Sequence, residues 1–283
     1  MMSVSRRTFI HAVGAALAVP AVTRGQEAAP ARTDALPLKT TGIEHLGIMV
    51  RDVERSGRFY GQLFNPALYR EKDPPLRYYA TLGVGYIAIG SLRDGAPRVD
   101  HFCTLVQGYR PQDVRASMES AGLGAPGRLG MIGDPDGLQL QLLGMPGGLA
   151  KSTVPADRLS QGEALVRPIG LENVRLLVAD VDKAADHYRK LFGGEGTRTR
   201  NPDRVWFQIE GTRLGLEKAG PGQSPRVDSF GVTVERLDPR AVGEALVKLG
   251  ATLDRPGENP SGQNNVLRFR DPDGIVLELK GRS

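Results

Sequence analysis

The chain has 283 residues, of which 40% are hydrophobic, a formal net charge of +5 and a single cysteine, Cys103. This composition supports packed cores in one large domain or two of ordinary size, and a single cysteine excludes an intrachain disulfide. The basic residues are spread along the chain and no nucleic-acid motif occurs, so we exclude a nucleic-acid partner.

Residues 1–25 have the pattern of an export signal. Arg6 and Arg7 precede an apolar run from Ala12 to Val19, and small residues follow it. This run is too short to span a bilayer as a helix, and the pattern is typical of a cleaved secretory signal. The paired arginines favour the twin-arginine export machinery over the general secretory route. We therefore expect a periplasmic or secreted protein with no membrane segment after cleavage, and a disordered lead-in over residues 26–41.

The first structured stretch predicts a strand followed by a helix. Residues 42–50 alternate, which places His45, Gly47 and Met49 on one face of a half-buried strand and apolar side chains on the other. Asp52 is a candidate N-cap for a helix over 52–64, whose apolar stripe ends at Leu63 and Phe64.

Further strands and a second helix are predicted in the rest of the first half. A proline-rich loop is expected from Asn65 to Leu76, and the turn Asp134–Gly137 has the residues of a tight turn. The expected strands cover 77–82, 86–89, 99–106, 129–132 and 138–143, and a helix from 111 ends at Gly122.

The whole plan then repeats. At a shift of 128 residues Gly42 matches Gly170, and Glu44 matches Glu172. The Asp-Pro-Asp-Gly turn recurs at a shift of 137, which places about nine extra residues in the loop Pro256–Asn264. A repeat of this length predicts a duplicated domain. We predict domain 1 over 42–144, a linker over 145–169 and domain 2 over 170–280. Domain 2 should contain strands over 171–178, 204–209, 213–217, 227–234, 265–270 and 275–279, and helices over 180–192 and 238–249.

These features resemble the vicinal oxygen chelate superfamily, which includes glyoxalase I, bleomycin-resistance proteins and extradiol dioxygenases. The resemblance rests on the paired β-α-β-β-β modules, the Phe-Tyr…Leu-Phe helix and the Asp-Pro-Asp-Gly turn before the last strand. It implies an α+β fold of two tandem domains. In each domain two modules would form a U-shaped sheet around a cleft that holds a divalent metal.

The resemblance also implies a set of site residues. In domain 1 the metal-ligand positions fall on His45, His101 and Gln141, and strand alternation independently allows all three to face one cleft. Tyr79, Met49 and Cys103 are the candidate substrate contacts. The equivalent positions of domain 2, expected to lack metal, are Asn173, Ser229 and Glu278. The fourth ligand position, a glutamate in glyoxalase-type members, falls on Ala88 and Gly215.

Several interpretations stay open at this point. His45 and His101 are either ligands of Fe²⁺, Mn²⁺ or Zn²⁺, or hydrogen-bonded residues that contact an organic molecule without metal. In domain 2 we hypothesise that a buried Arg175–Glu278 pair fills the metal position.

The leading function is a metal-dependent enzyme acting on a small substrate with vicinal oxygens, by dioxygenase-like or lyase/isomerase-like chemistry. The alternatives are a metal-free small-molecule binding protein of the bleomycin-resistance type and a pseudoenzyme. The sequence leaves the oligomeric state undefined.

Overall fold

The computed structural model describes residues 36–64, 68–144, 153–156, 159, 162–254 and 265–282. The predicted signal over 1–25 and the loop Pro256–Asn264 lie outside these residues. From Thr33 to Ser283 the chain forms one compact unit. Within the described part, no helix combines the length and the apolarity that crossing a membrane requires.

The first half contains two modules in which a strand and a helix are followed by further strands. In chain order these elements are β1 (Thr40–Val50), α1 (Val53–Phe64), β2 (Leu68–Glu71), β3 (Arg77–Leu82), β4 (Gly85–Ser91), β5 (Arg98–Val106), α2 (Pro111–Ser120), a 3-10 turn (Arg128–Gly130), β6 (Met131–Gly133) and β7 (Gln139–Gly144). Strand β8 (Thr153–Pro155) follows.

The second half repeats this plan. Its elements are β9 (Pro168–Val178), α3 (Val181–Phe192), β10 (Thr197–Arg200), β11 (Asp203–Ile209), β12 (Thr212–Lys218), β13 (Arg226–Val234), α4 (Pro239–Lys248), β14 (Thr252–Leu253), β15 (Val266–Arg270) and β16 (Val276–Gly281). The resulting mixture of strand-rich sheet and few helices is the α+β class that the sequence predicted.

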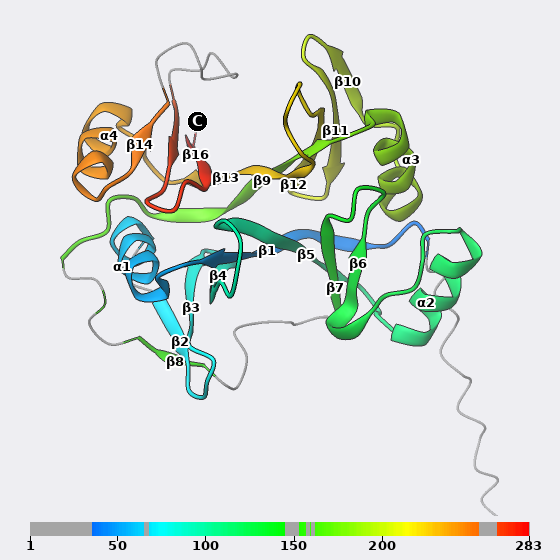
Figure 1. The fold of residues 1–283 in the computed structure, drawn as a ribbon, viewed down its shortest axis with the longest axis horizontal. Coiled ribbons are helices and arrows are strands. Elements are labelled where there is room, and N and C mark those ends of the chain that lie inside the picture. The colour runs from blue at the N-terminus through cyan, green and yellow to red at the C-terminus, as the bar shows by residue number, and fades with distance from the viewer. Residues whose placement is uncertain are drawn as a thin grey trace, which may run out of the picture. The chain divides into compact units, whose positions relative to one another are not determined.

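Within each half the two modules join through their first strands. Strand β1 pairs with β4 in parallel and with β5 antiparallel, and β5 continues to β7. Likewise β9 pairs with β12 and β13, and β13 continues to β16. One residue pair, Val99 and Val227, joins the two halves through β5 and β13. Figure 1 shows the two halves as two layers, with α1 and α4 at one end and α2 and α3 at the other.

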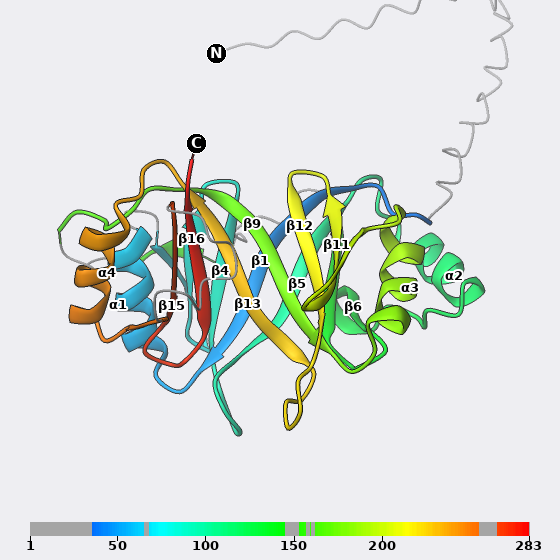
Figure 2. The same ribbon diagram turned by 90° about the horizontal axis from the view of Figure 1, so that it is seen from above.

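The hydrophobic core is continuous between these layers. Leu46, Ile48 and Val50 of β1 are completely buried and belong to this core, as predicted. The prediction that β1 is only half-buried is wrong, because His45 and Gly47 on its other face are buried as well. The matched positions of β9, Val174, Leu176 and Val178, are completely buried as well. All six belong to one cluster of buried side chains that draws on both halves. The strands of the two layers cross one another in Figure 2.

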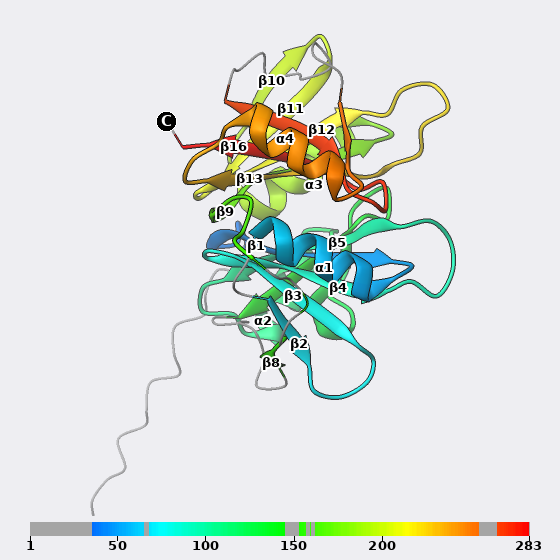
Figure 3. The same ribbon diagram turned by 90° about the vertical axis from the view of Figure 1, so that its left-hand side faces the viewer.

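Two matched tyrosines also connect the halves. The hydroxyl of Tyr60, on α1, donates to Asp271 at 2.8 Å, and that of Tyr188, on α3, donates to Asp134 at 3.2 Å. Each aspartate opens the Asp-Pro-Asp-Gly turn of the other half. Burial raises the pKa of Asp271 to about 6, although the Tyr60 hydrogen bond opposes the shift. The layer that contains α4 lies over the layer that contains α1 in Figure 3.

The structure differs from the predicted elements in its short strands. Strand β2 lies inside the predicted loop 65–76 and β8 inside the predicted linker, where it pairs with β2. Strands β10 and β14 were also not predicted. Stretches of two to four residues are too short to show a period, and their pairing depends on a neighbouring strand. At the start, Leu38 is buried and β1 begins at Thr40, inside the predicted lead-in.

Candidate functional site

The predicted ligand positions of the first half lie on the face of its sheet that is turned away from the core, here called the site face. Across neighbouring strands, Tyr86, His45, Cys103 and Gln141 form one row. Paired residues project to the same side of a sheet, so these four side chains share the site face. They are nearly buried, with only 4% of His45 and 8% of Gln141 exposed.

Two carboxylates reach this face because of two of the three register shifts in the β1–β5 ladder. The register shifts between Ile43 and His45, which leaves Glu44 without a partner on β5. It shifts again after Gly47, which leaves Asp100 without a partner on β1. A bulge re-aims side chains that regular alternation would send to the opposite face. Glu44 and Asp100 each lie directly before one of the candidate histidines.

Each carboxylate binds the histidine that follows it. The Nδ1 atom of His45 is hydrogen-bonded to the Glu44 carboxylate, and that of His101 to the Asp100 carboxylate at 3.1 Å. The His101 hydrogen bond lowers the pKa of Asp100. Among the residues that the structure describes, no hydrogen bond reaches Nε2 of either ring. If Nδ1 carries the proton in each pair, both Nε2 atoms keep a lone pair for a ligand.

The two imidazole rings lie side by side. Their centroids are 5.6 Å apart and the rings are nearly perpendicular, at 87°. The ring of Tyr86 stacks on His45 at 4.5 Å and 12°. Gly47 lies beneath His101, and a Cβ atom at this glycine would collide with the imidazole. The glycine therefore creates the space in which His101 lies.

Gln141 and the three predicted substrate contacts lie around this pair. The amide nitrogen of Gln141 donates to the carbonyl of Leu129 at 2.9 Å, so its amide oxygen is the group left to act as a ligand. Tyr79 stacks edge-on against Tyr86, with centroids 5.7 Å apart, and donates to Glu71. Met49 lies further along β1, opposite Gly90.

The third predicted contact, Cys103, lies inside the row. Ligand atoms of Glu44, His45 and Cys103 are within 4.8 Å of one another, close enough for a metal ion to bind all three. Burial, reinforced by the Glu44 charge, raises the pKa of the Cys103 thiol. The thiol is therefore protonated at neutral pH unless a metal displaces the proton.

The second half has register shifts at the two matching positions, but there the carboxylates bind cations. Glu172 and Asp228 lie at the register shifts of the β9–β13 ladder. Asn173, which is matched to His45, donates to Glu172, just as His45 is hydrogen-bonded to Glu44. Glu172 also pairs with Arg213 and, at 3.3 Å, with Lys280. Asn173 and Ser229 stand where the first half has its two histidines, and the expectation that this half lacks metal stays a prediction.

The predicted Arg175–Glu278 pair is wrong. Arg175 occupies the position matched to Gly47, and it pairs with Asp228 and, at 3.5 Å, with Glu217. Asp228 lies on β13, directly beside β9, whereas Glu278 lies on β16, one strand farther away. Within the described residues Glu278 makes no ion pair, and burial raises its pKa.

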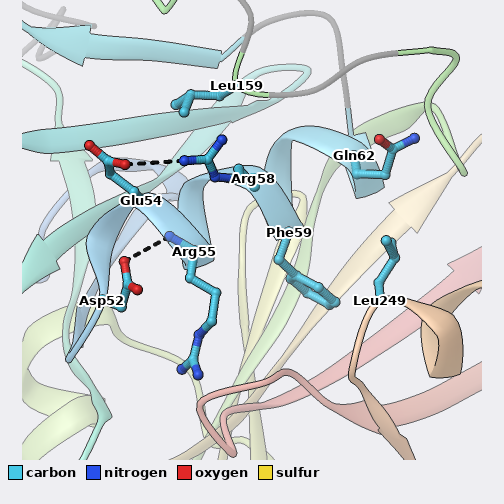
Figure 4. A pocket seen from close by; sticks show the side chains of 8 residues that line it. All are labelled: Asp52, Glu54, Arg55, Arg58, Phe59, Gln62, Leu159 and Leu249. Carbon is cyan, nitrogen blue, oxygen red and sulfur yellow. Dashed lines mark hydrogen bonds and ion pairs between the residues drawn. The ribbon is translucent and has the colours of Figure 1, made fainter.

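A cavity of about 530 Å³ runs along α1, away from the histidines (Figure 4). Its lining consists of Asp52, Glu54, Arg55, Arg58, Phe59, Gln62, Leu159 and Leu249. The charged groups in it already have partners, since Arg58 pairs with Glu54 at 3.1 Å and Asp52 accepts from the backbone of Arg55. Neither histidine lies in it, so we do not assign it a catalytic role.

Sequence reasoning missed Glu44, Asp100 and Tyr86. A signal for two of them was present, because an acidic residue precedes the positions of both candidate histidines in both repeats: Glu44 and Glu172, Asp100 and Asp228. Alternation assigned these carboxylates to the opposite face, and only the bulges show otherwise.

Comparison with known proteins agrees with the fold. Residues 170–279 match the Glyoxalase/Bleomycin resistance protein/Dioxygenase superfamily. The "Probable lactoylglutathione lyase, chloroplastic" of Arabidopsis thaliana is 24% identical, and the match covers 81% of this chain and 70% of that protein.

Two solved structures share the architecture at low identity. The 2,3-dioxygenase LapB from Pseudomonas sp. KL28 superposes with a TM-score of 0.64 at 14% identity, over 87% of this chain and 94% of that one. The Mn(II)-bound glyoxalase from Novosphingobium aromaticivorans gives 0.57 at 17% identity, over 86% and 83%. The chain therefore has the fold of these dioxygenases and glyoxalases, and its residues 170–279 are similar to the Glyoxalase/Bleomycin resistance protein/Dioxygenase superfamily.

Proposed function

We propose that the first half binds a divalent metal through His45 and His101 and acts on a small substrate with two adjacent oxygens. The observation that carries this proposal is the matched pair of Nδ1–carboxylate hydrogen bonds, to Glu44 and Asp100. Histidines that bind metals through Nε2 characteristically donate the other ring N–H to a carboxylate, which fixes the tautomer and the ring orientation.

The neighbouring donors fit such an ion. Two neutral imidazoles and the amide oxygen of Gln141 are suitable ligands for Zn²⁺, Fe²⁺ or Mn²⁺. A bound ion would supply Lewis-acid polarisation of two adjacent substrate oxygens. Because Ala88 occupies the fourth ligand position, this chain offers no carboxylate there to serve as a base.

The surrounding side chains would shape the reaction. Glu44 and Asp100 hold the two imidazoles in fixed orientations, and Tyr86 covers one face of His45. Burial, with the Glu44 charge, raises the pKa of Tyr86, so its hydroxyl stays protonated and can donate a hydrogen bond to a substrate oxygen. The likeness to both dioxygenase and glyoxalase structures supports either ring-cleavage-like or lyase/isomerase-like chemistry.

Metal content tests this proposal directly. The chain from residue 26, without a polyhistidine tag, is reconstituted with Fe²⁺, Mn²⁺ or Zn²⁺, and its metal is measured by elemental analysis. We expect near-stoichiometric metal in the wild type and its loss in both His45→Ala and His101→Ala, because each removes a ligand. The control is His187→Phe, on α3, which places there the residue found at the matched position 59.

Two results would count against this assignment. Metal retained by His101→Ala but lost by Cys103→Ser would place the ion among Glu44, His45 and Cys103 instead. A wild type that takes up none of the three metals would contradict metal-dependent catalysis. It would favour a metal-free binding protein, and ligand screening would follow.

We also propose that the chain is exported through the twin-arginine route, because Arg6 and Arg7 precede a short apolar run. The full-length chain is expressed in a bacterium with this route, and the periplasm and cytoplasm are separated. Replacing both arginines by lysine should shift the protein into the cytoplasm, whereas Arg24→Lys should leave it exported. Continued export of the double variant would point to the general secretory route.

A further inference from the structure

A cavity of about 240 Å³ lies on the second-half face that corresponds to the site face. It is lined by Asn173, Arg175, Arg204, Trp206, Arg213, Ser229, Val266, Arg268, Glu278 and Lys280. Four arginines and one lysine thus line a cavity whose lining contains a single acidic residue. Nothing in the metal proposal for the first half uses this cavity.

The carboxylates behind the cavity are shared between cations. Glu217 pairs with both Arg175 and Arg204, and Asp228 pairs with both Arg175 and, at 3.7 Å, Arg268. A guanidinium has more N–H donors than one shared carboxylate can satisfy. The cationic groups also repel one another, since burial and the nearby Arg175 lower the pKa of Arg268. Arg268 also pairs with Asp254 at 2.8 Å, and Arg213 and Lys280 both pair with Glu172. What the network retains for an added anion is therefore unused N–H donors rather than an excess of positive charge.

Two further observations point the same way. Only 10% of the Arg175 side chain is exposed. Its Nε atom is buried and has no hydrogen-bond partner among the described residues. Such an unpaired donor is costly in a folded protein. Burial also raises the pKa of Glu278, the one acidic residue in the lining.

The remaining lining defines an apolar wall. Trp206 lies flat over Gly215, where a Cβ atom would come within 2.7 Å of the ring, and Val266 adds a second apolar group. The guanidinium of Arg213 lies 4.8 Å from the centre of the Trp206 ring. An occupant with both an anionic end and a flat apolar body would contact each kind of surface.

We propose that this cavity binds a small organic acid, with its carboxylate held by the arginines and its apolar body against Trp206. Planar guanidinium groups match the planar carboxylate and can donate to it in pairs. The cavity is smaller than the pockets of about 300–1,000 Å³ that hold drug-sized ligands, which restricts the occupant to a compact molecule.

The protein contains one tryptophan and seven tyrosines, so fluorescence excited at wavelengths that tyrosine does not absorb reports on Trp206 in this cavity. The chain from residue 26 is titrated with benzoate, with inorganic phosphate and with chloride at constant ionic strength. We expect a saturable fluorescence change with benzoate and a weaker one, or none, with phosphate. Ligand-induced shifts in the melting temperature provide a second measurement that does not depend on Trp206.

A matched pair of variants tests the residues. Arg213→Gln removes a lining guanidinium that pairs with Glu172, whereas Arg226→Gln removes one that pairs with Asp228 outside the lining. Both side chains are about equally exposed, at 40% and 46%. Benzoate affinity should fall at least tenfold in the first variant and change less than twofold in the second.

The proposal fails if benzoate gives no saturable change in either measurement, if phosphate binds at least as tightly, or if both variants weaken binding equally. A response to chloride equal to that of benzoate would show general ion binding and would also overturn it. None of these outcomes depends on whether the first half holds a metal, so the two proposals are tested separately.

Discussion

Replacing Arg175 by methionine should lower the free energy of unfolding by about 3 kcal/mol, because two nearly buried carboxylates each lose a charge-assisted hydrogen bond and keep only their other partners. Arg175 pairs with both Asp228 and Glu217, and only 10% of the Asp228 side chain is exposed. Methionine keeps a similar length and apolar stem. For a chain of this size the melting temperature should fall by about 6–12 °C, measured by thermal or urea unfolding.

The matched control is Arg226→Met, which removes another partner of the same carboxylate. The Arg226 side chain is 46% exposed. Ion pairs at such positions contribute about 0–1 kcal/mol, so this variant should unfold close to the wild type. Equal losses in the two variants would show that the buried position of Arg175 has no special weight.

The second large effect concerns Gly47. Gly47→Ala should reduce metal affinity by about 10–100-fold, the range typical when a group that orients a ligand is disturbed. The added Cβ would collide with the His101 ring, which must then move. Gly47 does not have a positive φ, so alanine meets no backbone penalty at this position. Affinity is measured by competition with a chelator of known metal affinity.

The control for this prediction lies in the other half. Gly231→Ala would bring its Cβ against the amide of Asn173, the residue matched to His45, where no metal is expected. This variant should keep the metal affinity of the wild type. If Gly47→Ala also keeps it, while His101→Ala loses the metal, the position of the His101 ring is not critical.

The parts of the fold with a clear period could be predicted from the sequence. The alternation from Gly42 to Val50 separates His45 from the buried Leu46, and the helix from Val53 ends at Phe64 as expected. Asp52 accepts from the backbone of Arg55, as an N-cap does. The repeat further indicated which positions are equivalent. These features depend on local sequence, which is why one chain suffices to find them.

The details that define the candidate site could not be predicted in this way. A bulge is a single extra residue in one strand, so it appears only when the partner strand is known. Pairing between strands that are distant in sequence determines on which face of the sheet Glu44 and Asp100 lie. Such pairing also places Arg175 beside Asp228 rather than beside Glu278. The matched acidic residues could be seen in the repeat, but the sequence did not show to which face of the sheet their side chains project.

The continuous core has a thermodynamic consequence for ligand binding. Since the buried side chains of both halves form one cluster, and Tyr60 and Tyr188 each bond to the opposite half, the two halves should lose their structure together. Any ligand that binds only the folded chain then stabilises all of it, by RT ln(1 + [L]/Kd). A metal in the first half would protect the arginine-lined cavity of the second half from unfolding, without any change in that cavity's shape. Metal bound in the first half would in this way lengthen the time for which the second half stays folded.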